Sequence, residues 1–280
     1  KKEKNKLEEL LVIKNTRKIN KIPDHNTKPI QYDCLRALKG IGPATENKLK
    51  NKGYKSLKEL KNHEKWGEKS KNFLNEIKEL DKPKTGHYQN SLEERIQGND
   101  WTIFDLYKNH NLKDFIILDI ETIGLSKVPL FLIGLAEIKK EKQKVKTTQY
   151  LARDFNEEKN ILLETRNHIK TQPLITFNGK KFDIPFIKRR SLHHNIETNI
   201  KENLNLDILK FAKNTWKEEL NNCKLKTLEK RYNVERKGDI PSGKVPDYYT
   251  QFTRTGNIGT LVPILEHNIQ DLVSTAKIFM

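Results

Sequence analysis

The stretch Phe115-Ile-Ile-Leu-Asp-Ile-Glu121 decides the fold, because it joins a short apolar run to a pair of acids. Such a run, bounded by polar residues, is typical of a buried strand. Asp119 and Glu121 are two positions apart, so on a strand their side chains point to the same face. Paired carboxylates at the end of a buried strand are costly unless a divalent cation lies between them. The alternative is an exposed strand end, where such acid pairs are common.

Apolar runs downstream of this stretch predict further strands, and segments with helical spacing alternate with them. We expect strands at residues 131–136, 147–151, 173–177 and 204–207. We expect helices at residues 157–170, after Asp183, and at 208–216, 224–232, 246–252 and 259–280. Three strands, then alternating helices and strands, then helices predict an α/β fold in which a mixed β-sheet is flanked by helices.

Further candidate site residues lie after the later strands and on the last helix. Asp183 suits a helix N-cap, with Pro185 in the first turn, and a carboxylate there is also well placed to face the acids of the first strand. His267 and Asp271 are four positions apart and share one helix face, although alone they also fit an ordinary surface pair. Asp207 is a fifth acid at a strand end. Asp207 could support the site or cap the following helix, and we favour the helix cap.

Three segments taken together resemble a known family. They are Asp119-Ile-Glu-Thr-Ile-Gly-Leu125, Thr176-Phe-Asn-Gly-Lys-Lys-Phe-Asp183 and His267-x-x-x-Asp271. In this order they resemble the three exonuclease motifs of the DEDD (DnaQ-like) 3′–5′ exonuclease superfamily, whose fold is ribonuclease H-like. Its YprB-like branch is suggested by Phe131-Leu-Ile-Gly-Leu135, Asn222-Cys-Lys-Leu-Lys-Thr-Leu-Glu229, Asp239-Ile-Pro241 and Leu265-Glu-His-Asn-x-Gln-Asp271. The resemblance covers roughly residues 114–280.

The resemblance implies a metal-dependent nuclease site. Asp119, Glu121, Asp183 and Asp271 match the four acids that hold two divalent ions, Mg²⁺ or Mn²⁺, for a two-metal mechanism. His267 matches the general base, although a His here stands at the spacing of the Tyr subfamily.

The resemblance also implies substrate contacts. Thr122, Leu125, Asn178 and Phe182 match positions that commonly contact the terminal nucleotide. Leu125 and Phe182 equally fit the core.

The N-terminal part carries a second motif, Gly40-Ile-Gly-Pro43 followed by a lysine-rich helix. Glycines allow backbone N–H groups to approach a phosphate, and Pro43 opens the helix. The motif resembles the helix-hairpin-helix, which implies that Gly40, Ile41, Gly42 and Lys48 contact a nucleic-acid backbone. Such hairpins also serve packing or protein contact.

These motifs predict how the chain divides into domains. We expect a small, all-α helix-hairpin-helix domain at residues 1–90, a linker at 91–113 and a ribonuclease H-like exonuclease domain at 114–280.

The composition of the 280-residue chain favours a polyanionic partner, since the formal net charge is +17. A lysine-rich surface from a genome of biased composition is the alternative. Two cysteines, Cys34 and Cys223, exclude a disulfide scaffold and a zinc site built from cysteine. No apolar run approaches the roughly 20 residues of a membrane span, and no signal core follows the charged start. We therefore expect a cytoplasmic protein without a membrane partner.

The leading interpretation is a 3′–5′ exonuclease that hydrolyses phosphodiester bonds of DNA, or of RNA, with a DNA-binding arm. The expected partner is nucleic acid that is single-stranded or has an accessible 3′ end. Two alternatives stay open. One is a structure-selective endonuclease or RNA-processing nuclease on the same fold. The other is a catalytically silent nucleic-acid-binding adaptor, against which the complete set of four acids argues.

Overall fold

A computed structural model describes most of the chain, in two compact units. The described residues are 10–19, 35, 38, 40–79, 112–139, 143–198, 200, 205–216, 219–236 and 238–280, without the side chains of 76–79 and 214–215. One unit comprises Lys1–Ile22, Leu112–Leu209 and Asn222–Met280, and the other Pro23–Asn111 and Lys210–Asn221. None of the described helices is long and apolar enough to cross a membrane.

The first unit is built on a six-stranded sheet in the order β1-β4-β3-β2-β5-β6. The strands are β1 (Leu11–Lys18), β2 (Ile116–Thr122), β3 (Leu130–Lys139), β4 (Lys144–Leu151), β5 (Leu174–Thr176) and β6 (Asn205–Asp207). Neighbours from β1 to β2 pair antiparallel, whereas β2, β5 and β6 pair parallel. The mixed sheet confirms the predicted fold class, and β2 to β6 confirm the predicted strands.

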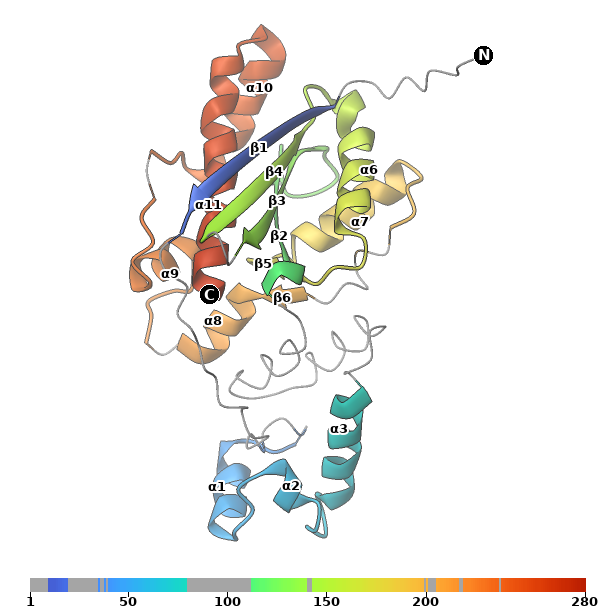
Figure 1. Ribbon diagram of the computed structural model, residues 1–280, viewed down its shortest axis with the longest axis vertical. Coiled ribbons are helices and arrows are strands. Elements are labelled where there is room, and N and C mark those ends of the chain that lie inside the picture. Colours follow the sequence, from blue (N-terminus) through green and yellow to red (C-terminus); the bar gives the residue numbers. More distant parts are fainter. Residues whose placement is uncertain are drawn as a thin grey trace. The chain divides into compact units, whose positions relative to one another are not determined.

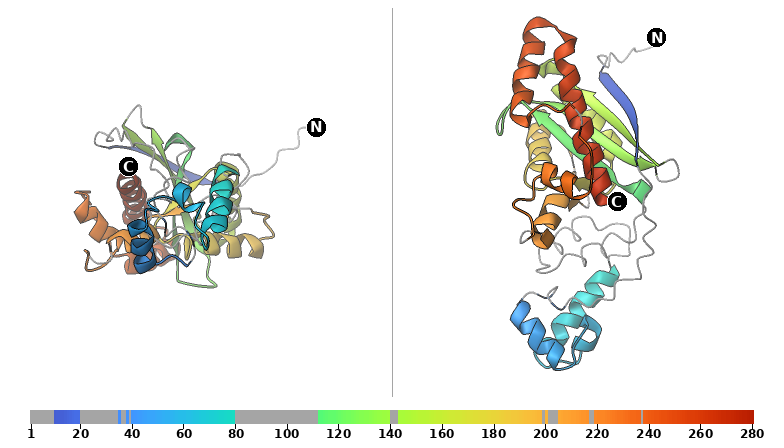
Figure 2. Two further views of the ribbon diagram at one scale, coloured as in Figure 1. Left: turned by 90° about the horizontal axis from the view of Figure 1, so that it is seen from below. Right: turned by 90° about the vertical axis from the view of Figure 1, so that its left-hand side faces the viewer.

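Helices cover both faces of this sheet (Figures 1 and 2). They are α6 (Glu158–Ile169), α7 (Asp183–His193), α10 (Val245–Thr255) and α11 (Leu261–Phe279), and α9 (Leu225–Arg231) packs on α11. Side chains of β2 alternate between the faces. Ile116, Leu118 and Ile120 join the core that α6 and α7 complete. Phe115, just before the strand, packs on Phe279 of α11. Asp119 alternates with Ile116, Leu118 and Ile120 along the strand, so it lies on the same face as Phe115 and faces α11.

The expectation that the chain is helical up to the linker is wrong for β1. Residues 11–18 form a strand that pairs with β4 along its whole length, from Leu11 opposite Leu151 to Lys18 opposite Lys144. The physical reason is tertiary, since β4 offers a free edge to a segment that contains Val12 and other β-branched residues. The strand belongs to the sheet unit, so residues 10–19 lie outside the predicted helical domain.

The second unit contains α1 (Pro43–Asn51), α2 (Leu57–Leu60), α3 (Gly67–Glu79) and most of α8 (Ile208–Trp216). Gly40 has a left-handed φ of 101°, and a Cβ there would lie 3.1 Å from the Trp66 ring. Gly42 is the N-cap of α1 and Pro43 is its first residue, which confirms the predicted turn and helix start. Ile41 is buried, so its side chain packs in the core of this unit. Nearly all of the predicted linker, 91–113, lies outside the described residues.

Candidate active site

The first two acids lie on β2, one of the two central strands of the sheet. Asp119 is paired with Gly134 of β3, and Glu121 with Leu132. Both acids lie on the face that α11 covers, and both are partly buried. The strand therefore presents two carboxylates beside the helix that carries His267.

Asp183 joins this pair from the start of α7. The structure makes it the first residue of the helix, so the N-cap alternative is wrong, and Phe182 occupies that position. Its Oδ1 accepts a hydrogen bond from the Ile120 N–H over 3.1 Å. Because Ile120 lies between Asp119 and Glu121 in the sequence, this bond fixes the third acid beside the first two.

Asp207 holds the loop that leads to Asp183. Its carboxylate accepts hydrogen bonds from the N–H groups of Asn178, at 2.9 Å, and Lys180, at 3.1 Å. It also accepts one from the Leu209 N–H at the start of α8, over 3.0 Å, as expected of a helix cap. Asn178 itself has a left-handed φ of 67°. The fifth acid therefore shapes the turn between β5 and α7.

α11 brings His267 and Asp271 to the same place. His267 is almost fully buried, and its Nε2 lies 3.7 Å from Asp271 Oδ2 and 4.0 Å from Glu121 Oε1. Ser242 Oγ lies 3.3 Å from the same nitrogen. The surface-pair alternative is therefore wrong for His267, and the helix face points at the acids of β2.

The four carboxylates interact with one another, and each has a raised pKa. Burial, followed by repulsion from the other three, raises the pKa of Asp119 well above its usual range. Burial and the charges of Asp271 and Asp183 raise the pKa of Glu121 in the same way. The pKa of Asp183 rises to about 7, chiefly through burial. Burial also raises the pKa of Asp271, although a neighbouring arginine opposes this.

The donor set fits divalent cations. The carboxylates are hard oxygen donors, and a cation among them would relieve the repulsion that raises their pKa values. Within the described part of the chain, no three His, Cys, Asp or Glu side chains are already arranged to hold a metal ion. Hydrogen bonds from the protein engage oxygens of Asp119 and Asp271 instead.

Two residues without an assigned role lie beside His267 and Asp271. The Asp239 carboxylate accepts a close hydrogen bond from Nδ1 of His267. Arg236 forms ion pairs with both Asp239 and Asp271. Burial opposes ionisation of Asp239, but hydrogen bonds from His267 and Lys226 outweigh it and lower its pKa. Asp239 and His267 are 28 positions apart, so no local spacing could have paired them.

Asn268 and Gln149 are further residues without an assigned role. Asn268 donates a hydrogen bond to Asp119, and Gln149 donates one to Asn268. Both amides are fully buried. In the sequence Asn268 stands in the segment Leu265-Glu-His-Asn-x-Gln-Asp271, which suggests a family branch but assigns Asn268 no role.

The four predicted substrate residues differ in their surroundings. Leu125 is 83% exposed on the loop after β2, which excludes the core alternative for this residue. Phe182 is half-buried against the core, with its ring centroid 5.6 Å from that of Phe186, so here the core alternative is confirmed. The Thr122 hydroxyl donates to a carbonyl of the following loop. Asn178 lies in the turn before Asp183.

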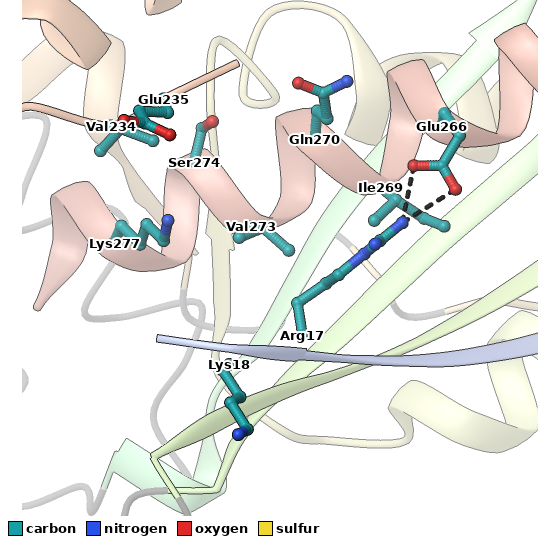
Figure 3. Close-up of a pocket in the computed structure, with 10 residues that line it drawn as sticks. All are labelled: Arg17, Lys18, Val234, Glu235, Glu266, Ile269, Gln270, Val273, Ser274 and Lys277. Atoms are coloured by element: carbon teal, nitrogen blue, oxygen red, sulfur yellow. Dashed lines mark hydrogen bonds and ion pairs between the residues drawn. The ribbon is translucent and has the colours of Figure 1, made fainter. Parts of the chain in front are cut away.

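A cavity of about 350 Å³ lies between β1, α11 and the segment after α9 (Figure 3). It is lined by Arg17, Lys18, Val234, Glu235, Glu266, Ile269, Gln270, Val273, Ser274 and Lys277. Arg17 Nη2 crosses it to both carboxylate oxygens of Glu266, at 2.7 and 2.8 Å, and so ties β1 to α11. None of the predicted catalytic residues lines this cavity, so it is separate from the acid cluster.

Residues 116–280 match the RNase_H_2 model of the RNase_H superfamily. The chain belongs to this superfamily. The match covers more than half of the chain and includes all four acids and His267. Membership confirms the ribonuclease H-like fold expected from the motifs, whereas the finer DEDD assignment stays a prediction.

The chain is similar to a curated protein and to a solved structure. It is 28% identical over 178 residues to the uncharacterized protein YprB of Bacillus subtilis (strain 168), which covers 62% of this chain and 43% of that protein. It thus spans less than half of the length of this relative. The family B DNA polymerase from the hyperthermophilic archaeon Pyrobaculum calidifontis is similar with a TM-score of 0.42 and 15% identity. That similarity covers 58% of this chain and 23% of the polymerase.

Proposed function

We propose that this protein is a metal-dependent 3′–5′ exonuclease that hydrolyses phosphodiester bonds of DNA, with RNA as the alternative substrate. The observation that carries the proposal is the meeting of four mutually repelling carboxylates with a buried histidine on one sheet face. Membership of the RNase_H superfamily supports a nuclease. The polarity of cleavage is inferred from the resemblance of the three motifs to the DEDD exonucleases.

Asp119, Glu121, Asp183 and Asp271 would hold two divalent ions, Mg²⁺ or Mn²⁺. When bound, such a pair stabilises the attacking and leaving oxygens of an in-line phosphodiester hydrolysis. The chain itself fixes where the carboxylates stand. Asp183 is held by the backbone of β2, and the other three are fixed on β2 and α11.

His267 would act as the general base. Its Nδ1 faces the carboxylate of Asp239, so the ring proton stays on Nδ1 and Nε2 is the nitrogen that can take a proton from the attacking water. Nε2 also lies on the side of Glu121 and Asp271. Asp239 thereby orients the ring toward the site.

The substrate would enter beside the loop after β2. Leu125 projects from this loop, and an exposed apolar side chain next to the acids suits contact with a terminal base. Thr122 and Asn178 would contribute polar contacts, whereas Phe182 packs against the core and is not assigned a substrate contact. The helix-hairpin-helix residues Gly40, Ile41, Gly42 and Lys48 would hold the backbone of the same nucleic acid.

Cleavage of end-labelled nucleic acid by wild type and Asp119→Asn tests the proposal. DNA and RNA, single- and double-stranded, are incubated with Mg²⁺, Mn²⁺ or EDTA, and the products are resolved on a gel. We expect a ladder shortening from the 3′ end in wild type, and a loss of at least about 100-fold in Asp119→Asn, because metal ligation underlies the rate. Asp247→Asn, an exposed acid of α10 paired with Lys244, is the matched control.

Other outcomes point to the alternatives. Internal cuts would indicate an endonuclease. Silence in every lane, with retained nucleic-acid binding, would indicate an adaptor. Undiminished cleavage by Asp119→Asn would remove Asp119 from the site.

A further inference from the structure

Asn268 lies next to His267 on α11, and its side chain reaches the first acid of β2. Asn268 Nδ2 donates a hydrogen bond to Asp119 Oδ2 over 2.7 Å. The same nitrogen lies 3.5 Å from the main-chain oxygen of Asp119. Asn268 is fully buried, so bulk water does not compete for this bond.

Gln149 of β4 determines which end of the Asn268 amide faces Asp119. Its Nε2 donates to Asn268 Oδ1 over 2.8 Å and to the Leu265 carbonyl over 3.0 Å. Because both N–H groups of the Gln149 amide donate to acceptors, Asn268 turns its oxygen to Gln149 and its nitrogen to Asp119. Turning the Asn268 amide around would bring two donors face to face at Gln149.

Gly134 of β3 provides the space for this arrangement. The register of the sheet places Gly134 between Asp119 on one neighbouring strand and Gln149 on the other. A Cβ on Gly134 would lie 2.1 Å from Asn268 Oδ1, which is far too close for a real contact. The missing side chain therefore lets Asn268 reach down from α11 and bridge β2 and β4.

We infer that Asn268 is a positioning residue for Asp119, and that Gln149 and Gly134 are required for it to act. The inference rests on the proposed function, in which Asp119 binds a divalent cation. The hydrogen bond engages Oδ2, fixes the carboxylate rotamer and allows Oδ1 to serve the cation. Groups that orient a metal ligand in this way typically change metal affinity by about 10- to 100-fold when they are removed.

Mn²⁺ binding to the full chain tests this role without any need for turnover. Free Mn²⁺ is measured by its electron paramagnetic resonance signal during a titration. Asn268→Leu replaces the amide by an apolar group of similar size, and we expect its Kd for Mn²⁺ to rise about 10- to 100-fold. Gln149→Leu keeps Asn268 but removes the donor that orients it, so we expect a smaller rise in the same direction.

Gln270→Leu is the matched control, because Gln270 is an amide on the same helix that lines the separate cavity of Figure 3. We expect it to bind Mn²⁺ like wild type. Thermal unfolding of each variant shows whether it is folded. A role confined to stability would lower the unfolding midpoint of Asn268→Leu and leave its Mn²⁺ affinity unchanged.

The outcomes separate this inference from the proposed function. Wild-type affinity in folded Asn268→Leu, together with lost binding in Asp119→Asn, would overturn the positioning role and leave the proposed function standing. Absence of Mn²⁺ binding by wild type would remove the proposed function and this inference with it. If Asn268→Leu does not fold, Gln149→Leu decides, and unchanged affinity there overturns the positioning role.

Discussion

Glu137 of β3 is an acid whose ionised form the fold stabilises. Its carboxylate contacts His168 Nε2 at 3.3 Å and forms an ion pair with Lys139. The hydrogen bond from His168 is the largest of the effects that lower the pKa of Glu137 to about 2, against the opposing effect of burial. Tyr150 in turn bonds the other nitrogen of His168 over 2.8 Å, which keeps the ring in place.

This lowered pKa predicts how stability depends on pH. Since the pKa is lower in the folded state than in the unfolded chain, where it is about 4.3, Glu137 stabilises the fold above that pH. The stabilisation is lost as the pH falls toward 2. We expect Glu137→Gln to lower the free energy of unfolding by about 1 kcal/mol at pH 7, and by progressively less toward pH 3. Urea unfolding across this range measures the difference.

Asp247→Asn is the control for this experiment, because Asp247 is two-thirds exposed in its pair with Lys244. Its difference from wild type should stay small at every pH. A constant gap between wild type and Glu137→Gln from pH 7 to pH 3 would contradict the prediction.

The packing of α11 on β3 depends on the absence of a side chain at Gly134. Gly134→Ala would drive a methyl group into the Asn268 amide, so we expect it to lower the free energy of unfolding by about 1–3 kcal/mol. Asn268→Ala opens the same space, and the double variant should be more stable than the sum of the two single changes predicts, by about 0.5 kcal/mol or more. A double-mutant cycle by chemical denaturation measures this coupling. Strict additivity would show that the two residues do not compete for space.

β1 protects the edge of β4. Without residues 1–19, β4 would expose a row of unpaired backbone groups, and such edges favour association with other chains. We expect the truncated protein to unfold at a lower temperature and to self-associate, as measured by thermal unfolding and light scattering. A monomer with the wild-type midpoint would show that β1 contributes little.

Arg17→Gln tests the contribution of the ion pair with Glu266 independently of the contribution of the strand. It keeps β1 but removes the bond to Glu266, and both side chains are more than two-fifths exposed. The change should therefore cost less than about 1 kcal/mol and leave the protein monomeric.

Elements from β2 to α11 were predictable because their signals are local. A four-residue apolar run, or apolar positions at helical spacing, identifies a buried face without knowledge of its partner. β1 was not predictable, since its pairing partner is β4, about 130 residues later in the chain. Leu11 and Val12 remain two-fifths exposed, so the strand lacks the apolar face that a sequence pattern would reveal.

Some residues of the candidate site were likewise predictable from the sequence and others were not. The four acids and His267 stand out as residue types in ordered motifs, and the structure brings them together. The roles of Asp239, Gln149 and Asn268 were not predictable, because they come from contacts between elements that are distant in the sequence. Gly134 was the least predictable of these residues, since it contributes only the space that its missing side chain leaves for the Asn268 amide.

At the scale of the whole molecule, the positive charge of +17 predicts salt-dependent binding to nucleic acid. Lys48 is exposed on α1, in the proposed helix-hairpin-helix. We expect Lys48→Ala to weaken binding of duplex DNA about equally for all sequences, and to reduce the slope of log K against log salt by about 0.9. Fluorescence anisotropy at several salt concentrations measures the slope.

Lys244→Ala is the matched control, because Lys244 is an exposed lysine of the sheet unit that is paired with Asp247. It should leave the slope unchanged. An unchanged slope in Lys48→Ala as well would count against backbone contact by α1.

The pairing of β1 with β4 also has a consequence for synthesis on the ribosome. Leu11 leaves the exit tunnel some 140 residues before its partner Leu151. At roughly 5–20 residues per second, β1 waits about 7–28 s for β4, while α1, α2 and α3, which lie between β1 and β2 in the sequence, are already synthesised. The nascent chain must therefore keep its first strand unpaired, and a chaperone that shields extended segments would have its longest opportunity there.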